Sequence, residues 1–140
     1  MLLYMQSVQA VDNPDAPDYQ AAFLARAKPY EERLSDAAGG GAGLTDAAVA
    51  YARFLDTELN QAYRQLLGRL DALSRQALVS SQRRWLAFRD AEIGFIDENW
   101  TPRNFGSSSV FSRADYRATL VKQRVLVLLA YLRNYPVSGR

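Results

Sequence analysis

Two pairs of carboxylates are the side chains of this sequence that could perform acid–base chemistry. Asp90 and Glu92 lie two residues apart, and Asp97 and Glu98 are adjacent. Glycosidases place two carboxylates across a cleft, but each of these pairs is too close in sequence to point into a common cleft from a helix. The chain also has no histidine and no cysteine, which removes thiol nucleophiles, the commonest metal ligand and the usual general base. We therefore expect no enzyme, no metal and no cofactor.

A second polar group recurs at helical spacing in two segments. Its members are Asp56, Asn60, Tyr63, Gln82, Trp85, Arg89 and Asp90. Residues three and four apart share a helix face, and a hairpin with its turn near 72–74 would bring the two segments together. Residues whose numbers sum to about 146 then face each other, which places Arg89 between Asp56 and Asn60.

Two interpretations of this polar group remain open. An arginine at a helix interface needs a partner, because an unpaired buried charge costs several kcal/mol. We accordingly expect Arg89 to pair with Asp56 or Asn60 across the helices, with Trp85 and Phe88 in the core. If Arg89 and Asp56 instead point separately into solvent, the stretch is a recognition surface.

Charge and hydropathy restrict the class of partner. Residues 1–36 carry three basic and six acidic side chains, whereas residues 37–140 carry fourteen basic and nine acidic ones. Opposite charges are interspersed along the same segments, unlike the dense basic run of many nucleic-acid binders, so we expect no nucleic acid. No apolar run approaches the ~20 residues of a membrane span. Val8-Gln9-Ala10 is either part of an ordinary N-terminus or the end of an export signal.

Helical periodicity dominates the chain, and strand-like alternation is nearly absent. We expect helices over about 18–36, 45–70, 75–99 and 112–134, capped in the last three cases by Thr45, Ser74 and Ser112. Pro29 should kink or split the first helix. Residues 101–109 contain Pro, Asn, Gly and Ser and are expected to form a loop.

These elements predict an all-α fold, an antiparallel three-helix bundle (up-down-up) with an additional N-terminal helix. The glycine-rich stretch 38–43 has the composition of a flexible linker. We therefore divide the chain into an N-terminal appendage with a short helix, residues 1–43, and a helical domain, residues 44–140.

The order of these motifs resembles the LprI-type lysozyme-inhibitor domain. The first motif is D-x-x-L-N-x-x-Y from Asp56, and the second is Q-x-x-W-x-x-F-R-D from Gln82. A Gly-Ser loop at 106–107 follows, and the closing segment contains R-x-x-x-L from Arg124. The likeness covers about residues 45–133.

The resemblance implies an exported bacterial protein, periplasmic or secreted, that binds a protein partner, with lysozyme-type muramidases as the target. The candidate contact residues lie in and before the loop. They are Asp97, Glu98, Gly106, Ser107, Ser108 and Ser109. The positive main body opposes electrostatic steering toward a basic lysozyme. The alternative is a non-catalytic adaptor, structural or immunity-like helical protein of the cell envelope or a secretion system.

The sequence departs from the family pattern in its cysteines. Family members commonly carry them at positions that correspond to Ala47, Ile93 and either Asp115 or Tyr116 here. All are missing together, as expected when bridges are lost as pairs. Packing must then stabilise the domain, and the N-terminal appendage is a plausible compensating element.

Overall fold

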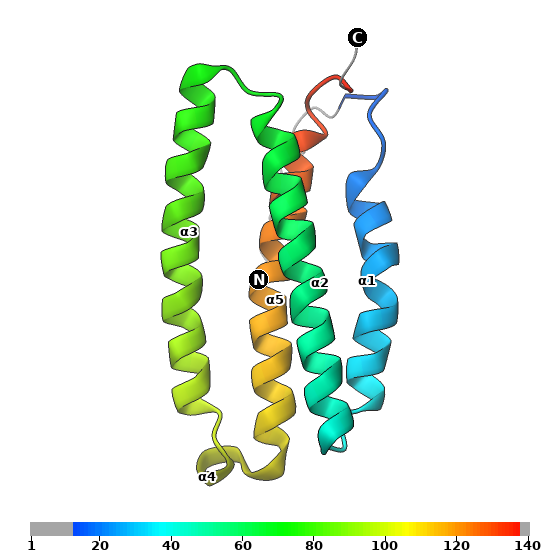
Figure 1. Cartoon of the computed structure of the whole chain (residues 1–140), viewed down its shortest axis with the longest axis vertical. Coiled ribbons are helices and arrows are strands. Elements are labelled where there is room, and N and C mark those ends of the chain that lie inside the picture. The colour runs from blue at the N-terminus through cyan, green and yellow to red at the C-terminus, as the bar shows by residue number, and fades with distance from the viewer. Residues whose placement is uncertain (1–12, 138–140) are drawn as a thin grey trace, which may run out of the picture.

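The computed structural model describes residues 13–137, and all regular secondary structure in that range is helical (Figure 1). Four long helices, α1 (Tyr19–Asp36), α2 (Ala42–Leu67), α3 (Ala72–Asn99) and α5 (Ser109–Leu132), run along the length of the molecule. A short helix α4 (Pro102–Phe105) and a 3-10 turn η1 (Gly106–Ser108) connect α3 to α5. The all-α prediction is confirmed for these residues, and the apolar run from Val125 is helical. The stretch Val8–Ala10 lies outside the described residues.

The hydrophobic core lies where α1, α2 and α5 meet. α2 packs most extensively against α5, and α1 packs against both. Phe23, Leu55, Val125 and Leu128 are fully buried there. The buried face of α2 begins at Leu44, whereas Ala48 is only partly buried and Ala52 is exposed. The facing sides of these three helices exclude water from one continuous apolar cluster, which is the main source of stability in such a fold.

The helix α3 stands apart from α2. Its main contacts are with α5, and the two helices α2 and α3 barely approach each other. Of its 28 residues, α3 buries Leu78, Gln82 and Ile96. The expected close pairing of these two helices is therefore not formed, because α1 and α5 already cover the apolar face of α2. Figure 1 shows α3 as the outermost helix on one side.

Polar contacts also join α1 to the core. Arg26 forms a two-pronged ion pair with the buried Glu58, with Nε–Oε1 and Nη2–Oε2 distances of 2.8 and 2.7 Å. Glu31 accepts a hydrogen bond from the Tyr51 hydroxyl at 2.9 Å and lies 2.6 Å from Lys122 of α5. These contacts cross three helices, so α1 is part of the same packed unit as α2 and α5.

Several predicted helix ends were wrong. α2 begins at Ala42 after Gly41, not at Thr45. α3 begins at Ala72, because the Asp71 carboxylate accepts a hydrogen bond from the Ser74 N–H at 2.8 Å and takes the capping role assigned to Ser74. α5 begins at Ser109 directly after the 3-10 turn, so Ser112 lies within the helix.

Pro29 does not divide α1, which is continuous from Tyr19 to Asp36. Proline removes one helical N–H and leaves the carbonyl four residues earlier without its usual donor. Here both Pro29 and Ala25 are exposed, so water can satisfy that carbonyl.

We predict that Phe23→Ala lowers the free energy of unfolding by about 3–5 kcal/mol, because it opens a cavity in the core. Leu24→Ala on the exposed side of the same helix is the matched control, with an expected change within about 0.5 kcal/mol. Urea denaturation followed by circular dichroism measures both. Equal, small effects would show that α1 is not part of the folding unit.

We predict that Glu31 makes stability depend on pH in the acidic range. Burial alone would raise the pKa of the Glu31 carboxyl, but hydrogen bonds from Lys122 and Tyr51 outweigh it and the net pKa lies below the ordinary 4.5. A carboxyl with a lowered folded pKa stabilises the fold above its unfolded pKa, and this contribution is lost as the pH falls through the folded pKa. The melting temperature of Glu31→Gln should therefore be lower than that of the unsubstituted chain at pH 7, with the difference shrinking below about pH 4.5.

Glu32→Gln is the control for this pH series. The Glu32 carboxylate pairs with Lys28 on the helix surface at 3.9 Å, a contact that contributes little. A pH-independent difference for Glu31→Gln would contradict the assigned role.

Candidate functional site

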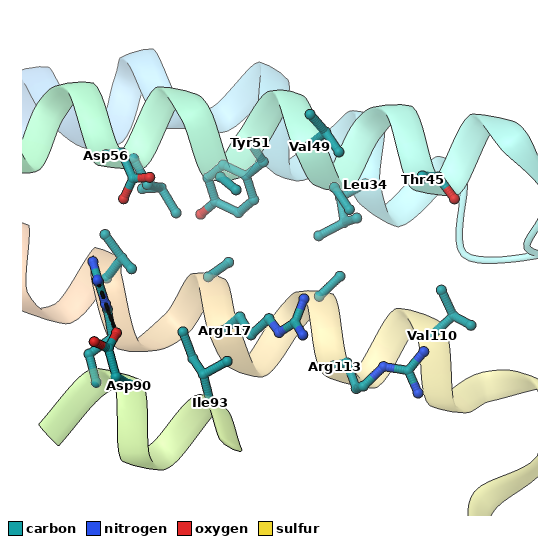
Figure 2. Close-up of a pocket in the computed structure, with 17 residues that line it drawn as sticks. Leu34, Thr45, Val49, Tyr51, Asp56, Asp90, Ile93, Val110, Arg113 and Arg117 are labelled. Atoms are coloured by element: carbon teal, nitrogen blue, oxygen red, sulfur yellow. Dashed lines mark hydrogen bonds and ion pairs between the residues drawn. The ribbon is translucent and has the colours of Figure 1, made fainter. Parts of the chain in front are cut away.

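A groove lies between α2 and α3 with α5 on its third side, and Figure 2 shows one part of it. Two hollows of about 430 and 440 Å³ make up the groove, and both are lined by Asp56 and Arg89. Ala48, Ala52 and Ile93 line the first hollow. These apolar side chains face open space because α3 does not close onto α2.

The first sequence motif lies along the α2 wall of this groove. Asp56, Asn60 and Tyr63 all line the second hollow. Asp56 is exposed, and in Figure 2 its carboxylate points from α2 into the space between the helices. The three residues thus share one face of α2, as their spacing predicted, but that face borders a groove.

Arg89 does not form the predicted contact across the helices. Its Nε and Nη2 groups donate to Oδ1 of Asp90, its neighbour on α3, at 3.2 and 3.1 Å. Within residues 13–137, Arg89 forms no ion pair or hydrogen bond with Asp56 or Asn60. The separation between α2 and α3 explains this, since the adjacent carboxylate is the acceptor within reach.

The second motif instead connects α3 to α5 through Arg124. The Arg124 Nε donates to Oε1 of the buried Gln82 at 3.0 Å, and its Nη2 donates to the Ser81 hydroxyl at 3.4 Å. Burial lowers the pKa of the Arg124 guanidinium below its usual range, and an arginine side chain stays charged at neutral pH. The hairpin alignment missed this contact because it paired the first two main helices. The R-x-x-x-L motif, which begins at Arg124, was the sequence feature that could have indicated this contact.

Trp85 lies close to two guanidinium groups. The Cζ atoms of Arg89 and Arg124 are 5.6 and 5.9 Å from the centre of its ring, which is within cation–π range. Trp85 is half-buried, whereas Phe88 is 53% exposed. The expectation that Phe88 belongs to the core was wrong, because its side of α3 faces away from α5 and no other helix covers it.

The segment between α3 and α5 is a compact end of the molecule, not the expected irregular loop. Thr101 caps α4 through a hydrogen bond from Asn104 N at 3.3 Å to its hydroxyl. The rings of Phe95, Phe105 and Tyr116 surround Trp100, with centroid distances of 5.8, 5.7 and 4.7 Å. This aromatic contact holds the turn in place, so the turn presents a defined surface.

The candidate contact residues at this end differ in accessibility. Gly106, Ser107 and Ser108 are exposed, and Gly106 has a φ of 70°, which favours glycine. Ser109 is fully buried and cannot touch a partner in this conformation, so its assignment was wrong. It begins α5 and lies beneath the turn.

The two acidic candidates also have different environments. Asp97 forms an ion pair with Arg117 of α5 and thereby ties the end of α3 to α5. Glu98 is exposed and, within the part of the chain that the structure describes, forms no ion pair. Glu98 is therefore the acid available to an external partner.

Residues 34–128 match the family described as lysozyme inhibitor LprI. The match covers most of the chain, including both polar motifs and Arg124, and the chain belongs to this family of inhibitor domains. No curated protein and no solved structure matches the chain.

Two features that are absent from residues 13–137 bear on the type of site. No group of three or more Asp and Glu side chains there could hold a metal ion. None of the helices in that range combines the length and apolar character needed to cross a membrane.

We predict that Arg124→Ala destabilises the fold more than Arg89→Ala does. The first change leaves the buried Gln82 side chain without its donor, which costs about 1–3 kcal/mol. The second removes a contact with a neighbouring, largely exposed carboxylate, and should cost less than about 1 kcal/mol. Urea denaturation monitored by tryptophan fluorescence measures both. A larger cost for Arg89→Ala would restore the cross-helix interpretation.

Proposed function

We propose that this chain is an exported bacterial protein-binding domain that inhibits a lysozyme-type muramidase. The match to the LprI inhibitor family over residues 34–128 is the observation that carries the proposal. Export into the periplasm or the medium would place the protein where such enzymes act on the cell wall.

The α4–η1 end is the proposed inhibitory element. Muramidases hold their two catalytic carboxylates in a cleft, and the long helices of this chain are too broad to enter one. The turn at Gly106–Ser108 is narrow, exposed and lies at one end of the molecule (Figure 1). Its small side chains suit a confined cleft, and the serine hydroxyls can donate to carboxylates.

Charged groups beside the turn would position it. Glu98 is exposed and can pair with basic residues at the rim of the cleft, while Asp97 is held by Arg117 and supports the end of α3. Rim charges mainly affect the association rate and are screened at ordinary salt. Inhibition through this end would therefore weaken as the ionic strength rises.

We further propose that α1 compensates for the missing cysteines. The family match begins at residue 34, close to the end of α1, so most of this helix lies outside the matched region. Phe23 and Ala27 of α1 are fully buried against α2 and α5. The helix α1 of the N-terminal appendage would thus supply by packing what disulfides supply in cysteine-containing members.

The groove favours a second candidate function, a non-catalytic adaptor. Asp56, Asn60 and Arg89 belong to the family motifs, yet they line an open groove. An adaptor of the cell envelope or a secretion system, or an immunity-like protein, could receive a segment of its partner there. Such docking would not involve the α4–η1 end.

We predict that Ser107→Trp weakens inhibition of a susceptible lysozyme at least about tenfold, because the indole cannot enter the cleft with the turn. Ser107 is exposed, so the melting temperature should change little. Ser80→Trp, at an exposed serine of α3, is the matched control and should inhibit normally. Initial rates of cell-wall lysis at several inhibitor concentrations give the inhibition constants.

The outcomes separate the two candidates. Equal inhibition by both variants would show that the contact with lysozyme does not lie at the α4–η1 end. If the unsubstituted chain in excess and at low salt slows no class of lysozyme, the inhibitor proposal fails and the adaptor proposal remains. Capture of an envelope protein that is lost on Asn60→Ala but kept on Ser107→Trp would then support the groove.

A further inference from the structure

The charges of α3 are separated along its length. All four basic residues of the helix, Arg75, Arg83, Arg84 and Arg89, precede its four acidic residues, Asp90, Glu92, Asp97 and Glu98. A helix has a positive N-terminal and a negative C-terminal end, and it is stabilised by the opposite arrangement of side-chain charges. The distribution of charge in α3 thus destabilises the helix by itself. A stabilising interaction elsewhere would explain this distribution.

Few of these charges are neutralised within the chain. Asp97 pairs with Arg117, and Arg89 pairs with Asp90. Among the ion pairs of residues 13–137, none involves Arg83, Arg84, Glu92 or Glu98. The basic half and the acidic half of α3 therefore both present free charge to solvent.

The outer face of α3 is also apolar. Leu73, Phe88 and Phe95 are 80%, 53% and 57% exposed, and Phe88 and Phe95 lie two turns apart on one face. Ala77 and Ala91 share this face and are exposed. No helix of the described chain covers these residues, since α3 packs against α5 on its other side.

We propose that this face of α3 docks against the same face of a second copy of the chain, with the two helices antiparallel. An antiparallel pair brings the basic half of each α3 against the acidic half of the other, and a two-fold axis satisfies both halves at once. A parallel pair would set like charges against each other. Charge complementarity thus favours a second copy of the chain as the partner and an antiparallel orientation of the two α3 helices.

The point where the charge changes sign sets the register. With the two-fold axis between residues 89 and 90, facing residues have numbers that sum to 179. Phe88 then faces Ala91 of the other copy, a large side chain against a small one, and the same contact recurs across the axis. Arg84 faces Phe95 of the other copy and lies one turn from its Glu98, within reach of a cation–π contact and an ion pair.

This arrangement leaves the proposed inhibitory ends free. Because the helices are antiparallel, the two α4–η1 turns would project at opposite ends of the dimer. The two proposals share Glu98, but the dimer depends mainly on Phe88, Ala91 and Arg84 of α3, and the inhibitor proposal depends on the turn at 106–108, so either can fail without the other.

Single cysteines test the dimer directly, because the natural chain has none. Ala91→Cys places the two thiols about 5 Å apart along the helix axes, with the axes themselves ~8–10 Å apart. A short bis-maleimide should then join two copies in high yield. Ala77→Cys is the matched control on the same face, with its two thiols ~38 Å apart along the axes, and should give no cross-linked dimer.

Cross-linking of both variants would indicate a parallel pair, and cross-linking of neither would indicate that α3 does not meet a second copy. Either result overturns the proposal. A monomer in sedimentation equilibrium whose Phe88 is required for binding a different protein would overturn it as well.

Charge reversal supplies an independent test on the full chain. Arg84→Glu and Glu98→Arg should each raise the dimer dissociation constant about tenfold or more, because each sets like charges together at two symmetry-related places. The double variant should recover most of the lost affinity. Arg53→Glu on α2, also at an exposed position, should leave it unchanged. Failure of the double variant to recover would contradict the antiparallel register.

Discussion

The contact of Arg124 with Gln82 and Trp85 determines how the motif-bearing helix joins the rest of the molecule. α3 buries few side chains, and its contacts with the fold are mainly with α5. Arg124 reaches from α5 to the buried Gln82 and lies over the Trp85 ring. A buried amide and a guanidinium that satisfy each other tolerate little displacement, so this contact specifies the position of α3 relative to α5.

The groove follows from this attachment. Because α3 is held against α5 and stays away from α2, the residues of the first motif line open space. Asp56 and Asn60 would need a different helix arrangement to serve as internal partners for Arg89. Their position gives the two polar motifs separate roles: the second joins helices, and the first shapes a surface.

Most of the core is built without α3, which adds Leu78 to it. α1 supplies Phe23 and Ala27 to the interface with α2 and α5, and its Glu31 links to both of those helices. A domain without disulfides must derive its stability from burial and paired polar groups. The outer helix is then free to carry exposed aromatic and charged residues, since core packing does not constrain that face.

The sequence by itself determined the helices, their approximate extents and the family. Periodicity is a local property, and the apolar run from Val125 was assigned correctly because each helix satisfies its own backbone hydrogen bonds. The shared face of Asp56, Asn60 and Tyr63 followed from the same geometry. Helix ends were less predictable, because neighbouring residues such as Asp71 and Ser74 compete for one capping position.

Only the tertiary structure decided which helices meet. A periodic pattern shows that a helix has an apolar face but does not name the helix that covers it, and the apolar face of α2 was covered by α1 and α5. The pairing of α3 with α5 then followed from long-range contacts between residues about forty positions apart, such as Gln82 and Arg124. Such contacts depend on how all the helix faces compete for one another, so no single segment encodes them.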